Sequence, residues 1–274
     1  MIRLAKWRQK RPAAGKNKPL IIGGFFRSGT SLFRRLLDAH SRIHCGPEVK
    51  FFRDFYGDYL TDPLSHIRFF QTARQLGINE KDLLQRFGKA FIKLHEHAAK
   101  IHGKKTWADK NPENVLYLEQ WHFLLGGRFT FVHVIRNPLD ALASLQEVGF
   151  KKTVPESFEE KVDLYSLYLA RAEAYLQRNP KNILTLRYED LVTSPEKTLT
   201  AFLEAIGENF EPWMLEAYLD PARRRGIEDP KVNQHKSINT GSIGRWKTDL
   251  TEAQCRYAGK KLANTELFCS YFDP

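Results

Sequence analysis

The sequence has few cysteines and no long apolar run. Cys45, Cys255 and Cys269 are its only cysteines, and so small and odd a number argues against a disulfide framework and for a reducing compartment. No stretch approaches the ~20 consecutive apolar residues that a membrane-spanning helix requires. The start of the chain also lacks the apolar segment of a secretion signal. We therefore expect a cytoplasmic protein with no transmembrane segment.

Acidic residues are missing from the first 18 positions, which carry seven Lys and Arg residues. Because the whole chain has a formal net charge of +11, residues 19–274 retain +4. We expect residues 1–18 to form a basic, disordered tail ahead of one α/β domain at 19–274. Such a tail could touch nucleic acid or an anionic membrane, but a short solvated terminus explains it more simply. We expect no specific nucleic-acid partner.

A glycine turn follows the first apolar run of the chain. Gly24 and Gly29 have the spacing of the nucleotide-binding P-loop, G-x-x-x-x-G-K-[ST], and Ser31 stands at its Ser/Thr position. The lysine of that motif is absent, because Thr30 occupies its place, and Arg27 is the one cation inside the loop. The backbone amides of such a turn, with the positive end of the following helix, can bind an oxyanion. A turn of this kind is often purely structural, so the loop alone does not decide the function.

Short apolar runs alternate with helical periodicity along the chain. The runs predict strands at residues 20–24, 43–45, 105–109, 129–135 and 182–188. The periodicity predicts helices from Thr30, over 139–145 and 160–177, and over 199–206 with Gly207 as C-cap. Strands separated by helices form parallel sheets with right-handed crossovers. We therefore expect an α/β fold with a P-loop-like parallel sheet flanked by helices, in a single domain.

Residues 51–100 read as irregular helices that cover an edge of this sheet. Core packing explains most of their aromatic side chains. Part of the segment could also form a wall of the site that binds an acceptor substrate, the molecule to which a group would be transferred. His95, His97 and His102 lie in or just after this segment, but they match no zinc-binding spacing such as H-E-x-x-H. A solvated helix face is the better interpretation of the three histidines, and we expect no metal.

Charged side chains stand close to the ends of several predicted strands. Arg27, Lys110 and Arg136 each follow a strand, and Glu48 lies in the loop after residues 43–45. In parallel sheets, ligands bind outside the carboxyl ends of the strands. Three cations and one carboxylate around a glycine loop therefore predict an anionic substrate with two separate charged ends.

Three classes of function are compatible with these features. A P-loop nucleotide or metabolite kinase would need the missing lysine and an Asp that helps to hold magnesium, whereas the clearest strand ends at Arg136. A basic polyanion-binding module would use the tail and the net charge and would not need Glu48 or Lys110. A transfer enzyme whose donor is held by Arg, Lys and backbone amides accounts for more of the residues.

Four segments resemble the PAPS-dependent sulfotransferases, most closely the branch of the tyrosylprotein sulfotransferases and their bacterial homologues. The segments are residues 26–32, residues 134–140 with Ser144, residues 186–191 and residues 239–246. They occur in the family's order, and the resemblance spans about residues 20–250. It implies an enzyme that moves a sulfuryl group from PAPS to an acceptor hydroxyl and releases PAP.

The resemblance also implies the residues that bind the cofactor. The 5′-phosphosulfate loop would consist of Arg27, Ser28, Gly29, Thr30 and Ser31. The 3′-phosphate would be held by Arg136 and Ser144, the adenosine by Tyr188, and Arg245 would lie near the phosphates.

Three catalytic residues follow from the same resemblance. Glu48 would be the general base, and Lys110 and Arg27 would stabilise charge on the sulfuryl oxygens and the departing phosphate. The acceptor could be a peptide tyrosine, a sugar hydroxyl or a small metabolite, and a homodimer is possible.

The chain departs from the tyrosylprotein branch at two places. A serine used near the leaving group corresponds to Gly244, so Ser242 or a backbone amide would have to replace it. The partner of a cysteine that those enzymes have at the Cys45 position corresponds to Ala108, so their disulfide cannot form here. An enzyme that acts on secreted proteins is therefore a weaker interpretation than a cytoplasmic bacterial relative.

Overall fold

The computed structural model describes residues 18–61, 63–147, 150–220 and 237–272. Almost all of the predicted basic tail at 1–18 lies outside these residues, so its separation from the domain stays a prediction. None of the described helices is both long enough and apolar enough to cross a bilayer. The cytoplasmic location stays a prediction as well.

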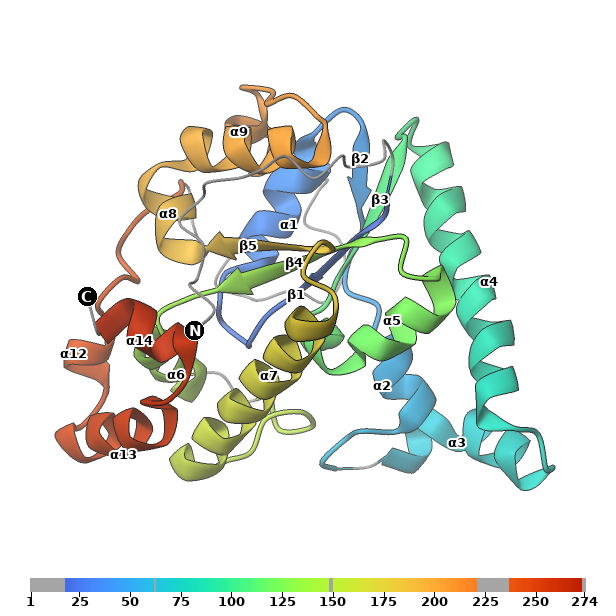
Figure 1. The fold of residues 1–274 in the computed structure, drawn as a ribbon, viewed down its shortest axis with the longest axis horizontal. Helices are drawn as coiled ribbons and strands as arrows, with labels where there is room; N and C mark the ends of the chain where they lie inside the picture. The colour runs from blue at the N-terminus through green and yellow to red at the C-terminus, as the bar shows by residue number, and fades with distance from the viewer. Residues whose placement is uncertain (1–17, 62, 148–149, 221–236, 273–274) are drawn as a thin grey trace.

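Five parallel strands form one sheet, in the order β2-β3-β1-β4-β5 (Figure 1). Their bounds are β1 (Leu20–Gly23), β2 (Ile43–Cys45), β3 (Thr106–Lys110), β4 (Thr130–Ile135) and β5 (Ile183–Arg187). All five predicted strands and the parallel sheet are confirmed. The chain places β1 between β3 and β4, so the loop that leaves β1 lies at the point where the strand order reverses, which is where such sheets bind ligands.

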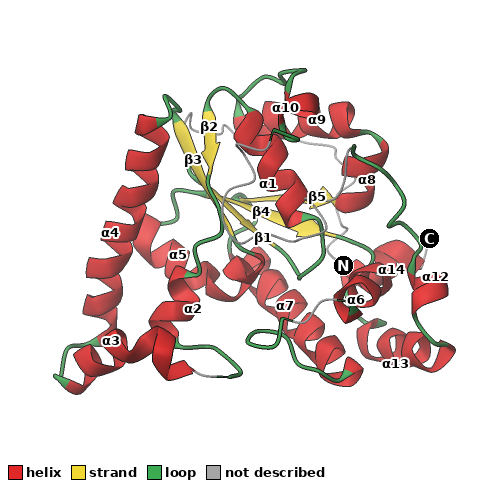
Figure 2. Cartoon of the chain, turned by 180° about the vertical axis from the view of Figure 1, so that it is seen from behind, coloured by secondary structure: helices red, strands yellow, loops and turns green. Residues whose placement is uncertain are grey.

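Helices cover both faces of this sheet. Figure 1 shows α5 and α7 in front of the sheet, and Figure 2, seen from behind, shows α1 against its other face. The described helices are α1 (Thr30–Ala39), α2 (Phe51–Tyr56), α3 (Pro63–Gln75), α4 (Glu80–Ile101), η1 (Pro112–Tyr117), α5 (Leu118–Leu125), α6 (Pro138–Gln146), α7 (Phe158–Arg178), α8 (Tyr188–Thr193), α9 (Pro195–Ile206), α10 (Met214–Ala217), α12 (Trp246–Asp249), α13 (Glu252–Leu262) and α14 (Glu266–Phe272). The predicted helices are confirmed, and Gly207 is the C-cap of α9, with φ 80°.

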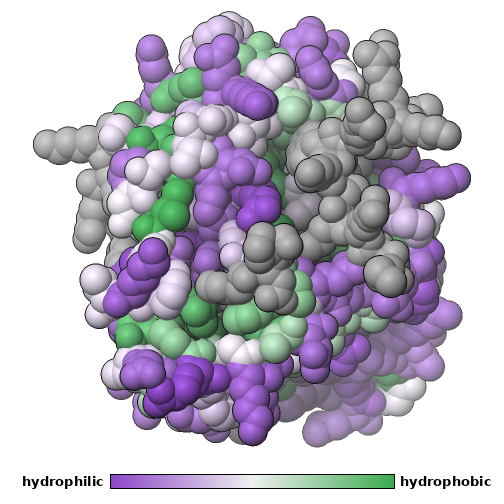
Figure 3. Space-filling view, turned by 60° about the vertical axis from the view of Figure 1, so that its left-hand side comes forward, coloured by the Kyte–Doolittle hydropathy of each residue, from purple (hydrophilic) through white to green (hydrophobic). Residues whose placement is uncertain are grey.

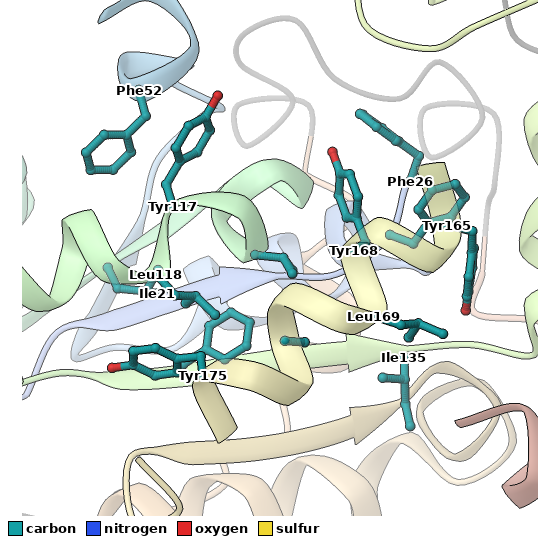
Figure 4. Packing of buried hydrophobic residues seen from close by; sticks show 14 of the residues in the cluster. Ile21, Phe26, Phe52, Tyr117, Leu118, Ile135, Tyr165, Tyr168, Leu169 and Tyr175 are labelled. Carbon is teal, nitrogen blue, oxygen red and sulfur yellow. The ribbon is translucent and has the colours of Figure 1, made fainter. Parts of the chain in front are cut away.

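The two faces of the sheet belong to two hydrophobic clusters. Ile21 packs in the cluster beneath α7, where Tyr168, Leu169 and Tyr175 also lie (Figure 4). Its neighbours Leu20 and Ile22 point to the opposite cluster, beneath α1 and α9. A strand that is buried on both sides needs a continuous apolar run, and this explains why β1 and β4 could be recognised in the sequence.

The face of the molecule in Figure 3 carries both hydrophilic and hydrophobic residues. The described residues on that face alternate between hydrophilic and hydrophobic ones, and the hydrophobic ones form small areas between the others. Such a surface is usual for a folded domain, much of whose accessible area is apolar.

The prediction of a solvated histidine face is wrong for His95. Its ring is 8% exposed and stacks on Trp107, with ring centroids 4.7 Å apart. Its Nε2 lies 3.2 Å from Oδ2 of Asp109. His97 and His102 are exposed, as expected. His95 therefore belongs to the contact between α4 and β3.

Three predicted strand ends also shift by one residue, one of them that of β1, which ends at Gly23 instead of at Gly24. Lys110 is the last residue of β3 instead of the first one after it, and Tyr188 begins α8 instead of ending β5.

Gly24 allows β1 to approach β4 closely. A Cβ at this position would lie 2.1 Å from the carbonyl oxygen of Val134, a backbone atom that cannot move aside alone. We expect Gly24→Ala to lower the free energy of unfolding by about 2–3 kcal/mol, as overpacked sites do. Denaturant titration measures this. The matched control is Gly46→Ala, whose Cβ would be 3.5 Å from its nearest neighbour; similar losses in both variants would contradict the explanation.

Candidate active site

The glycine loop after β1 is held in a strained turn. Gly29 has φ 90°, and a Cβ there would lie 2.4 Å from Cδ2 of Tyr188. Arg27, with φ 66°, is the one non-glycine residue with a positive φ in the part of the chain that the structure describes. Left-handed conformations of such residues cost energy and often occur at binding sites. The turn leads directly into the first turn of α1, an arrangement of amide groups that suits an anion.

Ser28 lies at the centre of this turn. Its side chain is fully buried, and its Oγ has no hydrogen-bond partner among the described residues. Thr30 and Ser31, which begin α1, are also buried. A buried hydroxyl without a partner costs free energy, so the loop holds a polar group that a bound anion could satisfy.

Lys110 brings three predicted site residues together. Its side chain is buried at the end of β3, where Nζ donates to Ser31 Oγ at 3.0 Å. The same ammonium forms an ion pair with Oε1 of Glu48, whose side chain is 17% exposed. The predicted base, the predicted catalytic lysine and the phosphate loop therefore meet at one point.

Arg136 lies on the other side of the loop. It is 3% exposed, and its Nη1 donates to the carbonyl oxygen of Arg27 at 2.8 Å. Its guanidinium stacks over the Tyr188 ring at 4.6 Å from the centroid. Its Nε is buried without a hydrogen-bond partner among the described residues. Burial lowers the pKa of Arg136, and the nearby Tyr188 and Asp140 oppose that shift.

Ser144, on α6, accepts a hydrogen bond from Nε of Arg27 at 3.0 Å. Ser144 and Arg136, the residues predicted for the 3′-phosphate, therefore both contact Arg27, one through its side chain and one through its backbone. The sequence order alone did not suggest that the two anion-binding ends would share this residue.

Asp140 belongs to the site, although the sequence analysis assigned no role to it. It is 1% exposed in the first turn of α6, and its two carboxylate oxygens accept from the backbone amides of Gly244, at 2.8 Å, and Trp246, at 3.0 Å. These bonds bring the segment 242–246 beside Arg136, whose Nη2 donates to the carbonyl oxygen of Ser242 at 2.6 Å. The sequence indicated a role for Asp140 only through its position in residues 134–140, one of the four segments that resemble the sulfotransferases.

Arg245 lies in this segment, but its guanidinium is held by carboxylates. It forms ion pairs with Glu147 and with Asp249. The predicted contact of Arg245 with cofactor phosphates, and the replacement of the missing serine by Ser242, stay predictions.

Cys45 and Ala108 are direct partners in the ladder between β2 and β3. The Cys45 thiol is buried, and burial raises its pKa. An inert thiol of this kind packs as a small hydrophobic side chain.

Known proteins resemble this chain in sequence and in fold. The model of the sulfotransferase family matches residues 19–212. Nodulation protein NoeE of Sinorhizobium fredii is 26% identical over 263 residues, which cover 85% of this chain and 61% of that protein. Protein-tyrosine sulfotransferase 1 of Rattus norvegicus is 61% identical over 36 residues, 13% of this chain and 10% of that protein. The chain thus spans about three fifths of the length of NoeE.

A solved structure has the same fold. The sulfotransferase domain of the olefin synthase from Synechococcus PCC 7002 superposes with a TM-score of 0.63 at 17% identity, and the match covers 92% of this chain and 97% of that one. The family model covers the glycine loop, Glu48, Lys110 and Arg136, the residues that the structure gathers at one edge of the sheet. This chain belongs to the sulfotransferase family.

Proposed function

We propose that the protein is a PAPS-dependent sulfotransferase that moves a sulfuryl group from PAPS to an acceptor hydroxyl and releases PAP. The observation that carries the proposal is the position of Lys110, which joins the carboxylate of Glu48 to Ser31 in the phosphate loop. A carboxylate that can accept a proton and a cation that can stabilise an oxyanion thus stand together at an anion-binding turn.

Two buried polar atoms support the binding of a ligand with two anionic groups. Oγ of Ser28 and Nε of Arg136 have no hydrogen-bond partners among the described residues. Ser28 lies in the turn assigned to the 5′-phosphosulfate, and Arg136 is assigned to the 3′-phosphate. A guanidinium binds phosphate through charge-assisted hydrogen bonds, and Ser144 would add a hydroxyl. Tyr188, which packs on both Gly29 and Arg136, would border the adenosine.

The same residues suggest how the transfer proceeds. Glu48 accepts the proton of the acceptor hydroxyl while the hydroxyl oxygen attacks the sulfur in line. Lys110 and Arg27 stabilise the charge on the sulfuryl oxygens and on the phosphate that leaves. The bond from the acceptor oxygen to sulfur forms as the bond from sulfur to the phosphate oxygen breaks, and no redox partner is needed.

The alternative functions account for fewer contacts. A P-loop kinase would need a lysine where Thr30 stands, and β4 leads into Arg136 instead of a magnesium-binding Asp. A polyanion-binding module would not need a half-buried Glu48 paired with a buried Lys110. The acceptor, whether tyrosine, sugar or small metabolite, and the homodimer remain open in this proposal.

Removal of the Arg136 side chain should selectively weaken binding of PAP. We expect Arg136→Ala to raise the Kd for PAP about 100-fold, because charge-assisted bonds to a phosphate are lost. Isothermal calorimetry measures the Kd of each protein for PAP and for ADP with magnesium. The control is Arg178→Ala, which removes an exposed ion pair with Glu119 far from the loop. Equal affinity of the wild-type protein for PAP and magnesium-ADP would refute the proposal.

Substitution of the proposed base should stop turnover but spare cofactor binding. We expect Glu48→Gln to slow sulfuryl transfer by about two to four orders of magnitude, the usual contribution of a general base, with the Kd for PAP changed less than twofold. Transfer from labelled PAPS is followed with a panel of p-cresol, a tyrosine peptide and a sugar as acceptors. Glu252→Gln, which alters an exposed carboxylate, is the control. Undiminished transfer in Glu48→Gln would remove Glu48 from the mechanism.

A further inference from the structure

We propose that Asn111 is a positioning residue for Glu48, and that the buried Asp109 fixes the orientation of its amide. The inference rests on the proposed function, because it concerns the residue proposed as general base. Asn111 follows Lys110 directly, and its side-chain nitrogen donates to Val49 and Asp109, which belong neither to the glycine loop nor to the proposed anion-binding residues.

The Asn111 side chain links the loops that leave β2 and β3. It is 4% exposed, and its Nδ2 donates to the carbonyl oxygen of Val49 at 2.8 Å. Val49 is the residue after Glu48, and the residues 46–50 between β2 and α2 belong to no helix or strand. A backbone bond to the adjacent residue therefore holds the segment that carries Glu48 against the end of β3.

Asp109 sets the direction of this amide. Its buried Oδ1 accepts from Nδ2 of Asn111 at 3.1 Å and from Nδ2 of Asn114 at 2.8 Å. Its Oδ2 lies 3.2 Å from Nε2 of His95, on α4. A carboxylate only accepts hydrogen bonds, so it keeps the NH₂ group of Asn111 turned inward, where the same group can also reach Val49.

Asn114 connects this cluster to the strand that enters the glycine loop. Its Nδ2 donates to the carbonyl oxygen of Ile22 at 2.9 Å, and its Oδ1 accepts from Nε1 of Trp121 at 3.0 Å. One buried carboxylate thus organises bonds to the end of β1 and to the loop of Glu48. Of the two asparagines it holds, Asn111 is the one that bonds to the Glu48 loop.

The placement of a general base matters strongly for its rate. A displacement of about 1 Å can slow a reaction by about two orders of magnitude. Because Lys110 also holds the Glu48 carboxylate, loss of the Asn111 bond should loosen the loop without releasing it. We therefore expect a smaller effect than removal of the base itself, seen in kcat and not in cofactor affinity.

The test compares Asn111→Ala with Asn182→Ala. Asn182 makes the same kind of bond, from Nδ2 to the carbonyl oxygen of Gly127 at 2.9 Å, at the opposite edge of the sheet. We expect Asn111→Ala to speed amide hydrogen exchange in residues 46–50 about fivefold. We also expect kcat for transfer from PAPS to p-cresol to fall about tenfold, with the KM for PAPS and the Kd for PAP changed less than twofold. Asn182→Ala should change none of these quantities.

Unchanged exchange in residues 46–50 of Asn111→Ala would overturn the inference, whatever the acceptor. Failure of the wild-type protein to bind PAP would refute the proposed function instead, and the exchange experiment would still test the bond from Asn111 to Val49. If Asn111→Ala folds poorly, Asn111→Thr, which has nearly the same volume but no amide, replaces it and should show the same fivefold faster exchange. A uniform rise in exchange throughout the domain would mean a purely structural role and would also overturn the inference.

Discussion

The buried ammonium of Lys110 is the interaction on which the candidate site depends. A lysine removed from water costs several kcal/mol unless its charge is paired and its protons are bonded. Here Glu48 and Ser31 do both, and they come from the loop after β2 and from the start of α1. Removal of one partner from a buried ion pair typically costs about 3–5 kcal/mol. The contact that places the proposed base is therefore also one that keeps the edge of the sheet folded.

The position of β1 explains why one short loop lies between two buried cationic side chains. Since β1 pairs with β3 on one side and β4 on the other, its loop meets Lys110 from one neighbour and Arg136 from the other. Arg27 lies between them, with its carbonyl oxygen bonded to Arg136 and its Nε bonded to Ser144. The strained φ of Arg27 is consistent with a backbone that is held in this shape from both sides.

The sequence predicted the parts of the molecule that depend on local pattern. Buried parallel strands need apolar runs, and their carboxyl ends share one edge, so the placement of Glu48, Lys110 and Arg136 around the glycine loop followed from strand positions alone. The roles of Asp140 and Asn111 could not be foreseen, because each bonds to backbone atoms far away in the sequence, and backbone partners leave no side-chain signal. Periodicity likewise could not show that His95 lies on the buried face of α4, with its ring against that of Trp107.

The site contains energetically unfavourable features that a bound ligand could remove. Ser28 and Arg136 each bury a polar atom without a partner, and burial lowers the pKa of the Arg136 guanidinium. Each is unfavourable in the free protein, yet together they leave two buried polar groups whose hydrogen-bonding capacity a bound anion could use. Donors that need not reorganise stabilise developing charge better than mobile ones. A ligand that satisfies them also stabilises the native state in proportion to its affinity. Folding therefore orders these polar groups in advance. The binding of an anion would need little further ordering of the site.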